Sequence, residues 1–130
     1  MERSITVAVI DSNSGTRQGL IRRLRQMHGI TVLGEAADPE EALRVVSEQR
    51  PDVVLMDVRW IDRDGAEFLS QMAAAVPKAR IVVLTAYVTE QERSQLMRAG
   101  AQAILLKEIG SDRLVHTMRT LAAQPAGGGD

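Results

Sequence analysis

The sequence contains no cysteine, and its 130 residues include one tryptophan, one tyrosine and one phenylalanine. Without cysteine the chain has neither a disulfide framework nor a cysteine-based metal cluster, so oxygen atoms would have to bind any metal ion. No apolar run approaches the ~20 residues of a membrane span, and the first residues lack the pattern of a secretory signal. We therefore expect a cytoplasmic protein with no membrane contact.

The sequence also lacks an excess of charge of one sign. The formal net charge is −1, with 16 Lys and Arg residues against 17 Asp and Glu residues, which gives no support for nucleic-acid binding by this segment. The length suits one domain, and 45% apolar residues suffice for one core, which we expect Met56, Met72 and Met97 to help fill. We assign residues 1–123 to that domain and interpret 124–130 as a flexible tail or linker.

Short apolar runs rich in β-branched residues predict buried strands, separated by segments with helical periodicity. The predicted strands are 5–10, 31–36, 53–56, 81–84 and 103–106. The predicted helices begin after Asn13 or Ser14 and at Asp38-Pro39, and then lie at 66–75, near 90–99 and at 111–123. Right-handed crossovers favour an α/β fold with a five-stranded, doubly wound parallel sheet in the flavodoxin-like order 2-1-3-4-5 and one layer of helices on each face.

Four polar residues close or follow the apolar runs: Asp11, Asp57, Thr85 and Lys107. In the order 2-1-3-4-5 the first and third strands are neighbours, so Asp11 and Asp57 are expected to lie side by side where strand order reverses. Two close carboxylates repel each other unless a cation lies between them, and Mg²⁺ suits oxygen ligands. Lysine and threonine can donate to phosphate oxygens, and a carboxylate can attack phosphorus. The pattern therefore predicts a phosphate-handling site.

The residues around these positions resemble the receiver domains of two-component response regulators, over about residues 5–122. The segment PDVVLMDVRWIDRDG resembles the family's phosphoacceptor strand and loop, VLTAY its threonine-bearing strand end, and RAGAQAILLKE its last strand and lysine. Together with GEAADPEEAL, these stretches are most similar to the branch of the family that carries LuxR-type helix-turn-helix output domains.

The resemblance implies a signalling switch in a phosphorelay rather than an enzyme, with Asp57 accepting a phosphoryl group from a phospho-donor. The implied Mg²⁺ ligands are Asp11, Asp57 and the backbone carbonyl of Arg59. The residues implied to contact the phosphoryl oxygens are Thr85, Lys107 and the backbone of Val58 and Ala86. The implied partners are a histidine kinase or phosphotransfer protein, a second copy in a homodimer, and a C-terminal DNA-binding output domain outside this chain.

Ser12 departs from the family's pattern, because an acidic Mg²⁺ ligand usually stands at this position. A neutral hydroxyl is a weaker ligand for a hard cation, so we expect weak Mg²⁺ binding and slow phosphorylation of Asp57. Asp62 and Asp64 are candidates to compensate, or they simply form a turn or cap the next helix.

The switch residues depart as well. Ile104 stands at the usual aromatic switch position, so Tyr87 is the nearest aromatic substitute to act with Thr85. Glu108 follows Lys107 where many relatives have proline, so we expect a trans peptide bond there.

Two other functions remain open. The chain could be a receiver-like binding module that never carries phosphate, because Ser12 weakens the acidic site. The stretch SNSGT at 12–16 also resembles a flavodoxin phosphate loop, and Trp60 and Tyr87 could sandwich the ring of FMN. Against FMN binding, Arg17 follows the loop, and Asp57, Thr85 and Lys107 would have no role.

Overall fold

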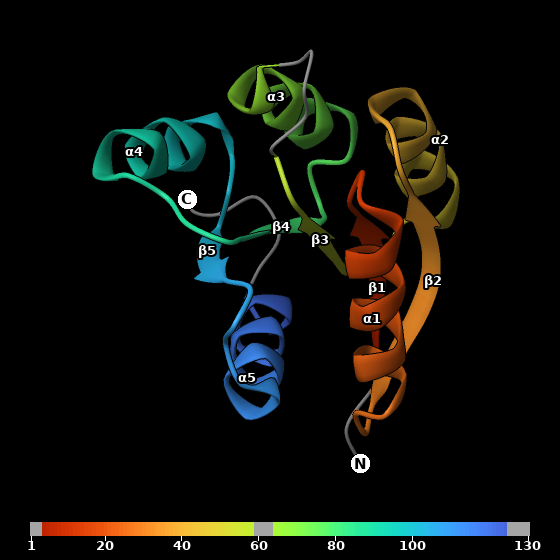
Figure 1. The fold of residues 1–130 in the computed structure, drawn as a ribbon. Helices are drawn as coiled ribbons and strands as arrows, with labels where there is room; N and C mark the ends of the chain where they lie inside the picture. Colours follow the sequence, from red (N-terminus) through yellow and green to blue (C-terminus); the bar gives the residue numbers. More distant parts are fainter. Residues whose placement is uncertain (1–3, 59–63, 125–130) are drawn as a thin grey trace.

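The computed structural model describes residues 4–58 and 64–124. Five parallel strands form one sheet in the order β2-β1-β3-β4-β5, which confirms the predicted doubly wound arrangement. The strands are β1 (Ile5–Ile10), β2 (Ile30–Ala36), β3 (Val53–Met56), β4 (Arg80–Thr85) and β5 (Ala103–Leu106). The helices are α1 (Ser14–Arg25), α2 (Pro39–Gln49), α3 (Gly65–Ala75), α4 (Glu90–Ala99) and α5 (Ser111–Ala122). Helices α1 and α5 cover one face of the sheet, and α2, α3 and α4 cover the other (Figure 1).

The register of the central strands brings their carboxyl ends to one edge. Ile10 of β1 pairs with Met56 of β3, and the amide of Asp57 donates to the carbonyl of Ile10 at 3.0 Å. On the other side of β1, the amide of Asp11 donates to the carbonyl of Ala36 at 3.1 Å. Asp11 and Asp57 are therefore fixed by the sheet ladder itself, one residue beyond neighbouring strands.

Side-chain caps mark where four helices begin, with Thr89 capping α4. Asn13 accepts from the amide of Thr16 at 2.8 Å, so Asn13 rather than Ser14 caps α1. Asp38 caps α2, with Pro39 at its first position, as predicted. Asp64 accepts from the first amides of α3, which makes this residue a helix cap; Asp62 lies outside the described residues.

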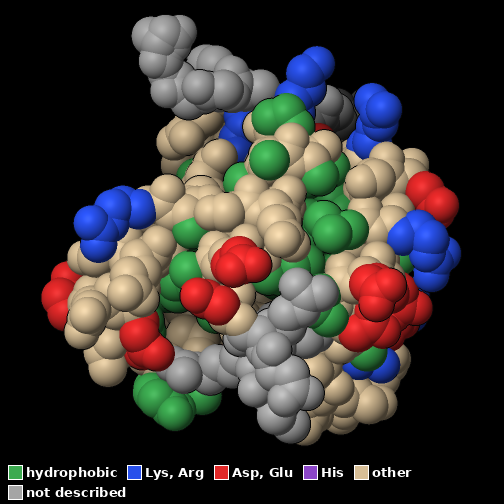
Figure 2. Space-filling view, turned by 90° about the horizontal axis from the view of Figure 1, so that it is seen from above, with side chains coloured by type: hydrophobic (Ala, Val, Ile, Leu, Met, Phe, Trp, Pro, Cys, Tyr) green, Lys and Arg blue, Asp and Glu red, His purple; other side chains and the backbone are tan. Residues whose placement is uncertain are grey.

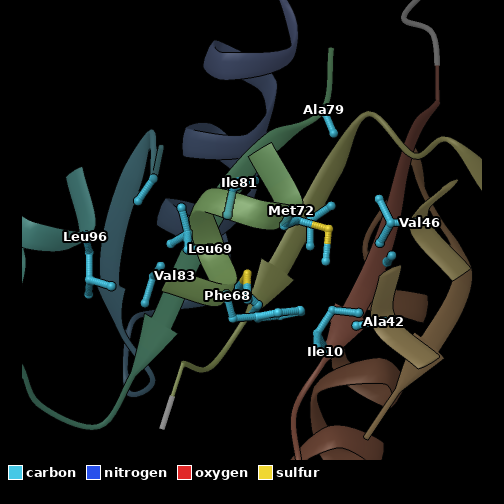
Figure 3. Close-up of a cluster of buried hydrophobic side chains, with 14 of the residues drawn as sticks. Ile10, Ala42, Val46, Phe68, Leu69, Met72, Ala79, Ile81, Val83 and Leu96 are labelled. Atoms are coloured by element: carbon cyan, nitrogen blue, oxygen red, sulfur yellow. The ribbon is translucent and has the colours of Figure 1, made fainter. Parts of the chain in front are cut away.

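Two apolar clusters hold the helices against the sheet. The cluster under α2, α3 and α4 contains Phe68, which points from α3 toward Ile10 of β1 (Figure 3). Full burial of a side chain of this size contributes about 1.5–3 kcal/mol. The cluster under the other two helices includes Ile21 and Leu24 of α1 and Leu114, Met118 and Leu121 of α5.

The prediction for the methionines was right at two positions and wrong at the third. Met56 and Met72 are buried, whereas Met97 is 41% exposed. The buried face of α4 is centred on Leu96, and the next residue lies about 100° around the helix, away from the sheet.

The surface carries mixed charge. On the side of α2, α3 and α4, acidic and basic side chains are interspersed, in keeping with the net charge of −1 (Figure 2). Within the described ranges, no helix combines the length and apolar character needed to cross a bilayer.

Arg80 connects β4 to the C-terminal end of α5. This buried arginine begins β4, and its guanidinium donates to the carbonyls of Leu121 (3.0 Å), Lys78 (2.7 Å) and Gln124. The side chain thereby ties β4 to the last turn of α5, whose carbonyl groups carry the negative end of the helix dipole. Nothing in the sequence pattern signalled this role.

Candidate functional site

Lys107 joins the two carboxylates at the edge of the sheet. Its Nζ lies 2.7 Å from Oδ2 of Asp57 and 3.1 Å from Oδ2 of Asp11. The three residues follow β5, β3 and β1, so the sequence-based expectation that these strand ends meet is confirmed by the geometry. Two carboxylates and one ammonium leave one negative charge in a small volume.

The surroundings of Lys107 favour its charged form. Burial lowers the pKa of the ammonium, but hydrogen bonds to Asp57 and Asp11 and the charges of both carboxylates outweigh burial, so the pKa is raised above 10.5. The lysine side chain is 27% exposed, against 14% for Asp57 and 8% for Asp11. The ammonium is therefore a fixed counter-charge at neutral pH.

Asp11 is held by contacts that the sequence analysis did not predict. Its Oδ1 accepts from the amide of Asn13 at 2.8 Å, and its carbonyl accepts from Nη1 of Arg17 at 2.8 Å. Arg17 in turn pairs through Nε with Oε1 of Glu35 at 2.8 Å, and Gln18 donates to the same oxygen at 2.6 Å. This network ties the start of α1 to β2 and fixes the turn that carries Asp11. The Arg17 to Glu35 pair spans 18 residues, so no local pattern points to it.

Thr85 ends β4 beside the same site. Its carbonyl accepts from the amide of Lys107 at 2.8 Å, which couples the ends of β4 and β5. Its hydroxyl donates to the carbonyl of Tyr87 at 3.1 Å, so the Thr85 side chain is engaged with the loop before α4. Tyr87 is 63% exposed, whereas Ile104 is buried in β5.

The remaining predicted residues border the site. Ser12 and Ala86 are exposed, and Val58 is half-buried. A Cβ on Gly65 would lie 2.5 Å from the Val58 carbonyl oxygen, so a glycine here lets the start of α3 approach the backbone after β3. Arg59 lies outside the described residues.

The two carboxylates at the site could bind a hard divalent cation, although they supply few of the ligands that it needs. The Oδ2 atoms of Asp11 and Asp57 both lie within 3.1 Å of one cationic atom, the Nζ of Lys107, so the two carboxylates converge on a cation already. Mg²⁺ commonly uses one or two carboxylates and keeps several waters. Across the described residues, no group of three or more His, Cys, Asp or Glu side chains has the geometry to hold a metal ion.

The trans peptide bond predicted after Lys107 is confirmed. Among the described residues, none of the peptide bonds is cis. The Lys107 to Glu108 bond is therefore trans.

The comparison with known families identifies the class of this domain. Residues 7–119 match the response regulator receiver domain, so the chain belongs to that family. The chain is 33% identical over 119 residues to the response regulator GacA of Pseudomonas aeruginosa, covering 92% of this chain and 56% of GacA. It is 35% identical over 111 residues to the transcriptional regulatory protein YhcZ of Bacillus subtilis, covering 85% of this chain and 52% of YhcZ.

Solved structures give the same assignment. The signal receiver domain of NarL from Mycobacterium tuberculosis superposes with a TM-score of 0.85 at 27% identity, covering 95% of this chain and 100% of that one. A LuxR-family response regulator from Aurantimonas superposes with a TM-score of 0.85 at 26% identity, covering 95% of this chain and 88% of that one. These matches confirm the resemblance to the LuxR-type branch and favour a receiver over an FMN-binding protein.

The chain spans about half the length of the curated relatives that it matches, 56% of GacA and 52% of YhcZ. It is a signalling domain of two-component response regulators.

Proposed function

We propose that Asp57 is the phosphoacceptor of this receiver domain. The observation that carries the proposal is the 2.7 Å contact between Lys107 Nζ and Asp57 Oδ2, with Asp11 on the other side of the lysine. Both carboxylates contact Lys107, and Asp57 has the shorter contact of the two. The amide of Asn13, the N-cap residue of α1, holds Asp11 by its Oδ1. Asp11 thus serves as a positioned metal ligand and Asp57 as the nucleophile.

The transfer step is a displacement at phosphorus. A carboxylate oxygen of Asp57 forms a bond to phosphorus as the bond from phosphorus to the donor breaks, and the donor leaves with the electron pair. Lys107 binds a phosphoryl oxygen in place of its contact with Asp57, and the Thr85 hydroxyl and the amides of Val58 and Ala86 donate to the others. Asp11 and Asp57, with the backbone carbonyl of Arg59 that the family implies, would hold Mg²⁺, which would neutralise charge on the transferring group.

Ser12 makes this a site of low metal affinity. It contributes a neutral hydroxyl where the family usually has a carboxylate, so the site holds one negative charge fewer. Asp64 does not take over that role in the proposal, because its carboxylate caps α3. We therefore expect phosphorylation to need high Mg²⁺ concentrations and to be slow.

In this proposal, Thr85 couples phosphorylation of Asp57 to a change in the loop before α4. When its hydroxyl turns to a phosphoryl group on Asp57, its hydrogen bond to the carbonyl of Tyr87 is lost, and the loop before α4 shifts between two states. Tyr87 is exposed and can change its position with that loop, whereas Ile104 is buried and has no ring to move.

The proposed partners follow from the family. A histidine kinase or phosphotransfer protein supplies the phosphoryl group, and a homodimer and a DNA-binding output domain carry the signal onward. In this proposal the receiver domain comprises residues 1–123, and residues 124–130 act as a linker or tail.

Intact-mass spectrometry after incubation with acetyl phosphate and Mg²⁺ tests the proposal. We expect one added phosphoryl group in the wild type and none in Asp57→Asn, which keeps the shape and removes the nucleophile. Phosphorylation of Asp57→Asn to the wild-type extent would overturn the assignment. Phosphorylation of Ser12→Asp but not of the wild type, even at high Mg²⁺, would instead favour a phosphate-independent binding module.

A further inference from the structure

A half-open cavity of about 190 Å³ lies beside the site, between α1 and the carboxyl ends of the central strands. It is on the side of the sheet that α1 and α5 cover (Figure 1). Buried residues of the strands, Val9, Leu55 and Leu84, close its floor, and Gly15, Gly19 and Leu20 of α1 lie opposite them. One end reaches Asp11, Asp57 and Lys107, so the cavity and the proposed phosphorylation site share a wall.

Two glycines on one face of α1 leave this space open. Gly15 and Gly19 are four residues apart and both line the cavity, and a Cβ built on Gly19 meets no heavy atom within 4 Å. Glycine within a helix is less stable than alanine by about 1 kcal/mol. The helix therefore forgoes stability that a larger residue would supply, and the volume stays unfilled.

The charged groups at the rim are already paired, which defines the chemistry of a ligand. Lys107 is bound to Asp57 and Asp11, and Arg23 donates to the Ser111 hydroxyl at 2.9 Å and to the carbonyl of Ile109. An ionic ligand would have to break one of these pairs, whereas a neutral apolar ligand would not. A closed apolar cavity of ~150 Å³ holds a molecule such as benzene, so the volume of this half-open cavity is sufficient for a ligand of that size.

We propose that this cavity binds a small, neutral, largely apolar molecule, between benzene and indole in size. Lys107 is the link to the site, because it lines the cavity and its ammonium contacts Asp57. A molecule packed against the lysine stem holds the ammonium on Asp57 and so slows phosphorylation. This second effect rests on the proposed function; binding itself does not.

Titration of ¹⁵N-labelled protein with indole, followed by NMR, tests binding directly. We expect saturable shifts of the amides of Gly15, Gly19 and Leu20 in the wild type. Gly19→Leu fills the cavity and should weaken binding at least about tenfold, a loss of ~1.4 kcal/mol. Arg22→Leu adds the same side chain on α1 at an exposed position that does not line the cavity, and should bind indole like the wild type.

Gly19→Ala is a second variant in case Gly19→Leu does not fold, because its methyl group fits the open space. It should weaken indole binding by a smaller factor. The proposal is overturned if indole causes no saturable shifts at α1, or if Gly19→Leu and Gly19→Ala both bind as tightly as the wild type. In a parallel assay with acetyl phosphate, indole should slow phosphorylation of the wild type but not of Gly19→Leu. If no variant is phosphorylated by acetyl phosphate, the proposed function fails while the NMR titration still decides whether the cavity binds indole.

Discussion

Lys107 and Asp57 form an ion pair of 2.7 Å across the carboxyl ends of β5 and β3. The lysine also contacts Asp11, so a single ammonium holds two carboxylates together. The carboxylate proposed as the nucleophile is thus already paired before any phosphoryl group arrives. We call this pair the latch, and in the proposed reaction a metal ion and a phospho-donor would have to open it.

We expect the latch to make the free energy of unfolding depend on pH in the alkaline range. The folded-state pKa of Lys107 lies above its ordinary value of 10.5, so its contribution to stability is fully present below that pH and is lost as pH rises through the folded pKa. Urea unfolding of the wild type and Lys107→Gln at pH 9 and at about pH 11 measures this loss. We expect the stability difference between them to shrink at the higher pH.

Lys78→Gln is the matched control, because Lys78 is exposed and is the other lysine of the chain. The free energy of unfolding of Lys78→Gln should differ little from that of the wild type at both pH values. If the wild type and Lys107→Gln lost equal amounts of stability between the two pH values, that result would contradict the role of the latch.

Ser12→Asp should strengthen Mg²⁺ binding about tenfold, since a third carboxylate supplies a charged oxygen ligand. The same change should lower the melting temperature without metal, because the added charge repels Asp11 and Asp57, and Mg²⁺ should restore it. Isothermal titration and thermal melts check both effects. Ser94→Asp, an exposed position on α4, adds the same charge away from the site and should leave Mg²⁺ affinity unchanged.

Arg80→Met should destabilise the fold by about 2–4 kcal/mol, because the carbonyls of Leu121 and Lys78 that now accept from the buried guanidinium lose their charged donor. Urea unfolding measures the change, and hydrogen exchange should show that the last turn of α5 opens first. Arg93→Met, at an exposed position on α4, is the control and should change stability by less than about 0.5 kcal/mol. Equal effects of the two substitutions would argue against an anchoring role.

Two glycines should respond in opposite ways to alanine. Gly19→Ala should stabilise by about 0.5–1 kcal/mol, because the new methyl group meets open space and the helix gains propensity. Gly29→Ala should destabilise, since this residue has φ +77 and a Cβ would lie 2.6 Å from a guanidinium nitrogen of Arg119. Chemical denaturation of the pair decides this, and a loss of stability in Gly19→Ala would show that the space is smaller than described.

The sequence predicted those features that local chemistry decides. Asp38 before Pro39 marked the start of α2, and apolar runs ending in polar residues placed Asp11 and Asp57 at neighbouring strand ends. Hydrophobic patterns and turn residues act over a few positions, so they can be read from the sequence. Alternating strands and helices allow only a few topologies, and this restriction led to the predicted strand order.

The contacts that position the site were not predictable in the same way. The pair of Arg17 and Glu35 and the ties from Arg80 to the end of α5 join residues far apart in sequence. Met97 was placed in the core by its residue type, but the helix turns it outward. The cavity beside Lys107 depends on how α1 packs on the sheet, which residue types alone do not fix.

The most direct test of the account locates the phosphoryl group chemically. Borohydride reduces an aspartyl phosphate to homoserine, and fragmentation of tryptic peptides then identifies the modified residue. After treatment with acetyl phosphate and Mg²⁺, we predict homoserine at Asp57, within the peptide 45–59, and unmodified aspartate at Asp11, within the peptide 4–17. Homoserine at Asp11 or at Asp52, with Asp57 unmodified, would contradict the assignment of Asp57 as the acceptor.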